Sequence, residues 1–248
     1  MRSNLNQVLA LAVRWGVIDQ NPVPQTEAIL TQRKKVKTIS PEQVQDFRAF
    51  IRDKAASPTP NTYIQQLDIV DLMLGSGIRI GEALALRKDR IRGLGTEKVS
   101  IVVDATLTRD ETGLIFAEVP KTDASNREVV LADFATEALQ RAIAMDLPGG
   151  PYNLVFPSLY GRDNLRQPGN VRDWLAKLVK GTPWEQFPGT HIFRKTVATA
   201  VANDDEAGGI ESAAKLLGHV DSVTTRKHYV ERVPLAPDVS STLNRFDE

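Results

Sequence analysis

The sequence predicts a mixed, mainly helical domain that contains one small three-stranded antiparallel β-sheet. Segments with apolar residues at helical spacing occupy both halves of the 248-residue chain. Between Lys98 and Leu131 the pattern changes to β-branched, alternating segments that are separated by turn residues. The chain is also long enough to bury a substantial core as one large domain.

Helical patterns extend over much of the chain. They are expected at residues 4–18, 61–74, 133–146, 169–180, 191–203, 208–217 and 222–231. Another helix begins in "TISPEQVQDF", where Ser40 is a favourable N-cap and Pro41 suits the first helical position. A short amphipathic helix is expected at the end of the chain, in "APDVSSTLNRFDE". It is too short to be stable alone, so it must pack on its own domain or on a partner.

Three segments have the character of β-strands. They are "KVSIVVDATL" (98–107), "GLIFAEVP" (113–120) and "REVVL" (127–131). The linking sequences "TRDETG" and "KTDASN" are rich in residues that favour turns, which predicts antiparallel connections.

Composition excludes several classes of protein. The chain has no cysteine, so it has neither disulfides nor a cysteine-ligated metal site, and its three histidines lack a metal-binding spacing. No apolar run approaches the ~18 residues that a membrane-spanning helix requires. No signal-peptide cleavage pattern follows the N-terminal helix. These features predict a cytoplasmic protein with no metal, no cofactor and no membrane partner.

Charge is balanced overall but clustered locally. The chain has 31 basic and 31 acidic residues, which counts modestly against a nucleic-acid-binding protein. Basic residues nevertheless concentrate in "TQRKKVK" (31–37), "RKDRIR" (87–92) and "RKHY" (226–229). Each cluster is either a binding patch or an ordinary solvated surface.

Cations occur at helix starts, where the helix dipole disfavours them by ~0.3–1 kcal/mol each. Arg79 follows the "GSG" turn, while His191 and Arg194 begin a helix for which Thr190 is a plausible N-cap. A bound anion would reverse the sign of this cost, because free backbone N–H groups and guanidinium donors both bind phosphate. An ion pair is the alternative for Arg79, and Glu82 is the obvious partner, which could also hold the guanidinium in place.

Two further residues stand at turns. Lys121 lies beside a predicted hairpin turn, where it is either a solvated lysine or a mobile proton donor. His219 follows Gly218, which suits the left-handed position that ends a helix. A histidine at this place is often only a partner of the helix dipole.

The order of these elements resembles the tyrosine recombinases, the phage-integrase family. Arg79 in "GIRIGEALAL", Lys121 in a β-hairpin, "HIFR", "LLGH" and then Tyr229 match the family's catalytic set in sequence order. The resemblance covers about residues 38–232 and implies the tyrosine-recombinase catalytic domain fold. Tyr229 lies ten residues after His219, one more than in many members, and this departure must be absorbed in the "VDS" turn.

The resemblance implies a role for each residue of that set. Tyr229 is expected to attack a DNA phosphate and form a 3′-phosphotyrosyl link. Arg79 and Arg194, assisted by His191, are expected to hold the non-bridging oxygens. Lys121 is expected to protonate the leaving 5′-oxygen, and His219 to support the transition state. Neither a metal ion nor ATP is required, and Arg79→Ala or Arg194→Ala is expected to abolish most cleavage while leaving folding largely intact.

The resemblance also predicts domains and partners. Residues 1–37 resemble the last helix of a core-binding domain followed by a basic linker, residues 38–232 form the catalytic domain, and residues 233–248 form a tail that docks in trans or in cis. The expected partners are double-stranded DNA, three further copies in a tetramer on DNA, and accessory DNA-bending or directionality proteins. Expected contacts with the DNA backbone are Arg33, Lys34, Lys35, Lys37, Arg226 and Lys227.

Two other functions share these features. A type IB topoisomerase uses the same chemistry to relax supercoils without synapsis, although "LLGH" and the compact size favour a recombinase. A catalytically incomplete DNA-binding fragment is the alternative from another class.

Overall fold

The computed structural model describes residues 2–26, 38–55, 60–118, 126–160, 162–187 and 189–218. The chain divides into two compact units, residues 1–35 and 36–248. The first unit contains α1 (Arg2–Arg14) and the short 3-10 helix η1 (Val23–Gln25). The Arg2 guanidinium donates to the carbonyl oxygens of Val23 (2.9 Å) and Thr26 (2.7 Å), which folds the chain back along the helix.

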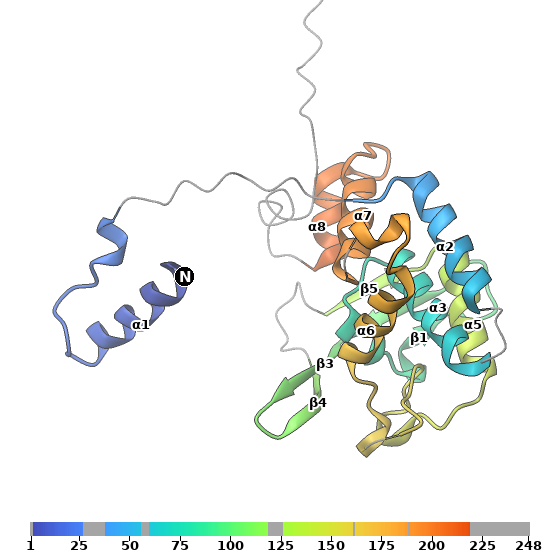
Figure 1. Ribbon diagram of the computed structural model, residues 1–248, viewed down its shortest axis with the longest axis horizontal. Coiled ribbons are helices and arrows are strands. Elements are labelled where there is room, and N and C mark those ends of the chain that lie inside the picture. The colour runs from blue at the N-terminus through green and yellow to red at the C-terminus, as the bar shows by residue number, and fades with distance from the viewer. Residues whose placement is uncertain are drawn as a thin grey trace, which may run out of the picture. The chain divides into compact units, whose positions relative to one another are not determined.

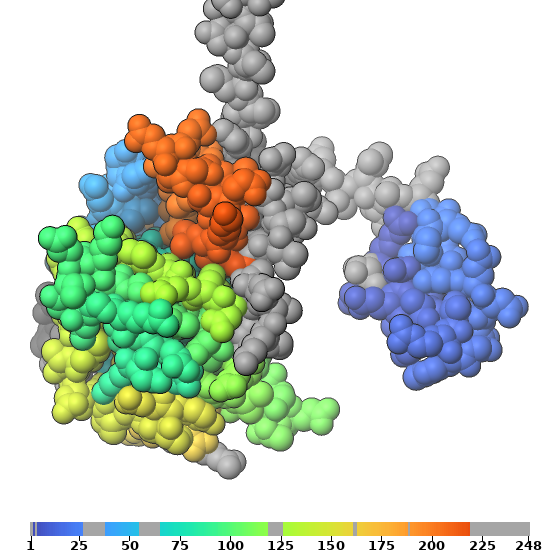
Figure 2. Space-filling model, turned by 180° about the vertical axis from the view of Figure 1, so that it is seen from behind, coloured from blue at the N-terminus to red at the C-terminus, as the bar shows by residue number. Residues whose placement is uncertain are grey.

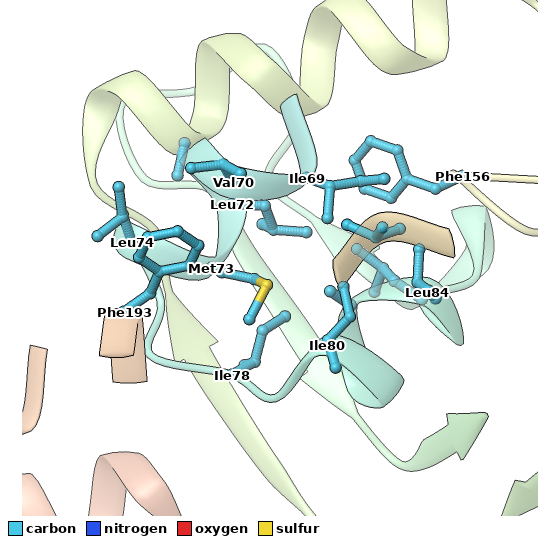
Figure 3. Close-up of a cluster of buried hydrophobic side chains, with 14 of the residues drawn as sticks. Ile69, Val70, Leu72, Met73, Leu74, Ile78, Ile80, Leu84, Phe156 and Phe193 are labelled. Carbon is cyan, nitrogen blue, oxygen red and sulfur yellow. The ribbon is translucent and has the colours of Figure 1, made fainter. Parts of the chain in front are cut away.

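The second unit is built around α3, as the ribbon in Figure 1 shows. Its helices are α2 (Pro41–Ala55), α3 (Pro60–Leu74), α4 (Ile80–Leu84), α5 (Asp133–Ala144), α6 (Pro168–Val179), α7 (His191–Ala202) and α8 (Gly209–Leu217). Residues 65–74 of α3 are all buried, and α3 contacts α2, α4, α5 and α7. Figure 3 shows Leu72 and Met73 of this helix among Ile80, Leu84 and Phe193.

Two helix ends lie where the sequence predicted them, the start of α2 and the end of α8. The hydroxyl of Ser40 accepts a hydrogen bond from the N–H of Gln43 (3.2 Å), and the Gln43 side chain accepts one from the N–H of Ser40 (3.0 Å). This reciprocal capping box begins α2 at Pro41, as predicted. At the other end of the unit, Gly218 adopts the predicted left-handed conformation (φ 65°, ψ 43°) and ends α8.

The strands are divided between two sheets, whereas the sequence predicted one. β1 (Ile91–Arg92), β2 (Ser100–Val103) and β5 (Arg127–Val130) form an antiparallel sheet in the order β1-β2-β5. β3 (Ala105–Asp110) and β4 (Gly113–Glu118) form a separate hairpin. The predicted strand 98–107 breaks at Asp104, whose Oδ2 accepts hydrogen bonds from Arg87 (2.7 Å) and Arg90 (2.6 Å). The fold class is as predicted: mainly helical, with a three-stranded antiparallel sheet and an additional hairpin.

The β3–β4 hairpin projects from the unit (Figure 1, Figure 2) but is anchored at its base. A Cβ atom on Gly81 of α4 would lie 2.5 Å from the Thr106 hydroxyl and 2.8 Å from the Leu107 carbonyl oxygen. Glycine therefore lets α4 pack directly against β3. This close packing fixes the start of α4, where Arg79 lies.

No described helix is both long enough and apolar enough to cross a membrane.

Candidate active site

A pocket of about 380 Å³ collects the cations that the sequence placed at two helix starts. The residues around it are Met73, Arg79, Ile80, Arg172, Gly189, Thr190, His191 and Arg194. We call this the cation pocket. Among the described residues, none of those lining it is an aspartate or a glutamate. Its walls therefore favour an anion.

The start of α7 forms one wall of the cation pocket. His191 is the first residue of this twelve-residue helix, and Gly189 and Thr190 precede it. The N-terminal dipole and free N–H groups of the helix attract an anion. Thr190 is the N-cap residue by position, but its backbone is helical (φ −72°, ψ −16°) and its side chain makes no capping hydrogen bond. Thr190 therefore occupies the predicted N-cap position, but its side chain does not cap the helix. A hydroxyl that does not cap leaves the first N–H groups of α7 to other acceptors.

Arg194 is fully buried, at 0% exposure, on the core side of α7. Its guanidinium donates hydrogen bonds to the carbonyl oxygens of Gly77 (2.8 Å) and Leu217 (2.5 Å). Gly77 lies two residues before Arg79, and Leu217 ends α8. Arg194 thus joins the segment before Arg79 to the end of α8 and is held by hydrogen bonds to both.

Arg79 and Glu82 form the ion pair that the sequence suggested. The Arg79 guanidinium donates to Glu82 Oε1 (2.9 Å), and the Arg79 backbone N–H donates to Glu82 Oε2 (2.8 Å). Arg79 is the N-cap residue of α4, just before the first turn in which we expected it. Its side chain is 45% exposed while that of Glu82 is 6% exposed, so the carboxylate holds the guanidinium from behind and leaves it open to the pocket.

Glu82 also binds Arg127, a residue that the sequence analysis missed. Arg127 NH2 donates to Glu82 Oε2 (2.9 Å), and Arg127 Nε donates to the carbonyl oxygen of Leu216 (2.8 Å). Burial alone would raise the pKa of Glu82, but the charge and hydrogen bond of Arg127, together with Arg79, hold it below its usual value. Glu82 is therefore ionised and supports both arginines.

The last turn of α8 is consequently held by two arginines. Its carbonyl groups at Leu216 and Leu217 accept from Arg127 and Arg194, respectively. Carbonyls at a helix C-terminus lack intrahelical partners, and cations stabilise them. Both arginines also bind the segment 77–82, so the end of α8 is fixed relative to Arg79.

The electrostatics of the pocket keep His191 neutral near pH 7. Partial burial lowers the pKa of His191, and the neighbouring charges of Lys195, Arg194 and Arg79 lower it further. A neutral imidazole can accept as well as donate a proton or hydrogen bond.

Several predicted site residues lie outside the described residues. They are Lys121, His219, Tyr229, Arg226, Lys227, Arg33, Lys34, Lys35 and Lys37. The helix expected at 222–231 and the C-terminal tail lie there as well. The structure thus brings together Arg79, His191 and Arg194, supported by Glu82.

One of the two missed arginines had a usable sequence signal. Arg127 shares a strand face with the buried Val129 and Leu131, whereas Glu128 and Val130 are exposed. An arginine in register with buried residues indicates a buried partner. Arg172 gave no such signal, because an exposed arginine on an amphipathic helix is typical of a solvated surface.

The basic cluster at 87–92 is paired with acceptors. Arg87 and Arg90 bind Asp104, Arg92 binds Glu128 (2.7 Å), and Lys88 donates to the carbonyl oxygen of Leu147 (3.3 Å). The side chains of this cluster are therefore held by acceptors within the domain. Within the described part of the chain, no group of three or more His, Cys, Asp or Glu side chains is arranged to hold a metal ion.

The chain is similar to transposon transposases and to site-specific recombinases. It is 26% identical over 145 residues to the transposase from transposon Tn916 of Enterococcus faecalis, an alignment that covers 58% of this chain and 34% of the transposase. The chain thus spans about a third of the length of the curated relatives that it matches.

Solved structures show the same fold. The Tn1549 transposon integrase in complex with a circular intermediate DNA matches with a TM-score of 0.70 at 19% identity, over 99% of this chain and 77% of that one. The XerH site-specific recombinase bound to its difH substrate matches with a TM-score of 0.64 at 16% identity, over 98% and 64% of the two chains.

The family model described as "Phage integrase family" matches residues 37–234. That range includes every described residue of the cation pocket and the predicted positions of Lys121, His219 and Tyr229. The chain belongs to the phage integrase family.

Proposed function

We propose that this chain is the catalytic part of a site-specific DNA recombinase, which cleaves and rejoins DNA through a 3′-phosphotyrosyl intermediate. The observation that carries the proposal is the cation pocket, where Arg79, His191 and Arg194 converge and no described acidic residue lines the wall. A phosphodiester that is being attacked gains negative charge on its non-bridging oxygens. Fixed cations around that position stabilise this charge without the reorganisation that water would require.

The pocket supports a division of labour between its residues. The exposed guanidinium of Arg79 and that of Arg194 bind the non-bridging oxygens, while Arg172 adds a third cation from α6. Neutral His191 accepts the phenolic proton of Tyr229 as the new bond to phosphorus forms. The bond to the 5′-oxygen breaks, and Lys121 protonates that oxygen. Cleavage conserves one phosphoester bond, so rejoining needs no external energy source.

Two anchored segments support the proposed positions of the remaining residues. His219 follows Gly218 directly, and the preceding carbonyl of Leu217 is bound to Arg194. Lys121 precedes β5, whose first residue, Arg127, is bound to Glu82. Both segments therefore start or end beside the cation pocket, within the reach of a few residues of extended chain.

The test is the trapping of a covalent protein–DNA adduct. The substrate is a pool of nicked suicide duplexes with a randomised core, because a nick lets the 5′-hydroxyl fragment diffuse away and prevents rejoining. We expect the wild-type chain to form an adduct and Tyr229→Phe to form none while still binding DNA. Tyr152→Phe is the matched control, since the ring of Tyr152 stacks on Phe116 of β4, away from the cation pocket. An adduct that persists in Tyr229→Phe would place the nucleophile elsewhere.

The same assay, together with a plasmid relaxation assay, distinguishes a recombinase from the two alternative functions. Relaxation of supercoiled plasmid together with an adduct would indicate a type IB topoisomerase. DNA binding without any adduct would indicate a catalytically incomplete fragment.

We further propose that residues 1–37 are the last helix of a core-binding domain with a basic linker, that residues 38–232 are the catalytic domain, and that residues 233–248 are a docking tail. The tail would join four copies on double-stranded DNA. Residues Arg33, Lys34, Lys35, Lys37, Arg226 and Lys227 would contact the DNA backbone. Sedimentation of the full chain and of a chain that ends at residue 233, both with DNA, tests the role of the tail. Loss of the tetramer in the shorter chain is expected, and an unchanged tetramer would refute it.

A further inference from the structure

Arg166 is a largely buried arginine without a carboxylate partner among the described residues. Its NH2 group donates to the Gln65 side-chain oxygen and to the carbonyl oxygen of Pro157 (2.8 Å), both neutral acceptors. Its Nε–H has no hydrogen-bond partner within the described part of the chain. Burial lowers the pKa of Arg166 to about 10. A guanidinium removed from water without a counter-charge is costly, which points to an anion that completes the site.

Arg166 lines a pocket of about 210 Å³ that is separate from the cation pocket. We call it the Arg166 pocket. Its other walls are Gln65, Gln66, Met145, Leu147, Ser158, Leu159, Tyr160 and Asn170. None of these lining residues is acidic. The pocket is smaller than the ~300–1,000 Å³ typical of small-molecule sites, so it suits one ionic group of a larger ligand.

A second buried polar group faces the same space. Gln66 is only 5% exposed, and its Oε1 atom has no hydrogen-bond partner in the described residues. Asn170, in the first turn of α6, adds a polar side chain and the positive end of the helix dipole. Arg166 and Asn170 together offer hydrogen-bond donors to an anion in this pocket.

The Arg166 pocket shares two helices with the cation pocket. On α3, Gln66 lines the Arg166 pocket and Met73 lines the cation pocket. These two residues are seven positions apart, which is two helical turns or about 10 Å along one face of the helix. α6 contributes Asn170 to the Arg166 pocket and Arg172 to the cation pocket. A ligand that presents several anionic groups at short intervals could occupy both. Duplex DNA carries one phosphate per strand every ~3.4 Å of its axis.

We propose, on the basis of the proposed function, that the Arg166 pocket is a second phosphate site, which binds a backbone phosphate of the DNA away from the one that reacts. Arg166 and Asn170 hold this phosphate. The contact positions the duplex and carries no sequence information. It is a binding contact and takes no part in the cleavage step.

The first test observes Arg166 directly. In the full chain with ¹⁵N-labelled arginine, the Nε–H resonance of Arg166, assigned through Arg166→Lys, is followed as inorganic phosphate and then a short duplex of arbitrary sequence are added. We expect both to shift this resonance. A shift with inorganic phosphate alone would overturn the assignment to DNA, and no shift with either would overturn the site.

The second test measures what the site contributes to binding. Arg166→Gln removes the charge, and we expect duplex binding about tenfold weaker, with the slope of log affinity against log salt lower by about 1. Lys177→Gln is the matched control, because Lys177 is an exposed cation on α6, the helix that follows Arg166, and lies outside both pockets. Arg166→Lys keeps the charge and should retain the slope. Equal slopes for Arg166→Gln and wild type would overturn the proposal.

The same variants show whether Arg166 affects folding, cleavage or DNA binding alone. Arg166→Gln should unfold at the same or a higher temperature than wild type, since it removes an unpaired buried charge. At saturating DNA it should still form the Tyr229 adduct at a rate within a few-fold of wild type. If the wild-type chain forms no adduct but the duplex still shifts the Arg166 resonance, the proposed function fails and this site stands.

Discussion

Two clusters of arginines built around α3 differ in what they face. In the first, which we call the α3 charge cluster, Arg48 binds Asp71 (2.6 Å) and Arg141 binds Asp68 (2.8 Å), so arginines and buried carboxylates are equal in number. In the cation pocket, Arg79, Arg172 and Arg194 face a space that no described carboxylate lines. The carboxylate of Glu82 supports the pocket from behind the guanidinium of Arg79.

The difference separates structural charge from charge that is available to a ligand. Matched pairs such as Arg48–Asp71 hold α2 and α5 against α3 and leave no unbalanced charge. A surplus of cations is tolerated only at a surface where an anion or water can balance them. The first cluster should therefore control stability, and the second should control DNA cleavage.

The largest expected effect lies in the α3 charge cluster. Asp71→Ala leaves the Arg48 guanidinium without its buried carboxylate, and we expect the free energy of unfolding to fall by about 3–5 kcal/mol. Urea unfolding measures this loss. Glu137→Ala is the control, since its 66%-exposed carboxylate lies 3.9 Å from Arg141, and its effect should stay within about 0.5 kcal/mol. Equal stabilities for the two variants would contradict the comparison.

The next effect belongs to the cation pocket. Arg79→Ala should slow adduct formation by about 10²–10³-fold, with little change in stability, because its side chain is half exposed. Arg194→Ala should lower both the rate of adduct formation and the stability of the fold, because it leaves the buried carbonyls of Gly77 and Leu217 without a donor. The expectation of largely intact folding therefore applies to Arg79 alone. Near-wild-type cleavage by Arg79→Ala would exclude the pocket as the reacting site.

The pH dependence of stability provides a third test. Burial raises the pKa of Asp68 to about 6, so between about pH 4 and pH 6 the folded chain holds a proton that the unfolded chain has released. The contribution of Asp68 to stability therefore falls as the pH rises through this window and stays low above it. Asn cannot titrate, so Asp68→Asn does not lose stability in this way. The free energy of unfolding of the variant minus that of wild type should therefore rise by about 2–3 kcal/mol between pH 4 and pH 7. Parallel curves from chemical denaturation at several pH values would refute this account.

Arg127 forms a buried ion pair with Glu82, which in turn supports Arg79 of the cation pocket. We therefore expect Arg127 to act as a positioning residue for cleavage. Arg127→Gln loses the ion pair to Glu82 and weakens the bond to the end of α8, so the adduct should form about tenfold more slowly at saturating DNA, with unchanged DNA affinity. Arg127→Lys should recover part of the rate. Arg92→Gln is the control, since Arg92 is 64% exposed and pairs with Glu128 on the same sheet. A loss of affinity without a loss of rate would show that Arg127 contacts DNA instead.

The smallest expected effect concerns Arg172. Within the described residues it has no carboxylate partner and lies at the edge of the cation pocket. Arg172→Ala should lower the salt dependence of duplex binding by about one ion and weaken binding a few-fold. Fluorescence anisotropy over a salt series measures both. An unchanged slope would show that the Arg172 side chain remains in solvent and does not contact the DNA.

Local chemistry in the sequence determined most of the fold. Apolar spacing and the caps at Ser40 and Gly218 placed the helices within a few residues, because these signals act through hydrogen bonds and burial within one or two turns. The same local rules singled out Arg79, His191 and Arg194, since each lies at a helix start where its charge is locally unfavourable.

Only the tertiary structure decided which charges are balanced. Arg87 and Arg90 looked like a binding patch but meet Asp104, whereas Arg172 looked like a surface residue but borders the cation pocket. Arg127 meets Glu82 across 45 residues of chain, and Arg194 meets Gly77 across 117. Electrostatic energy depends on distance in space and on burial. Sequence spacing therefore identified the candidate charges, and the packing around α3 determined which of them face a ligand.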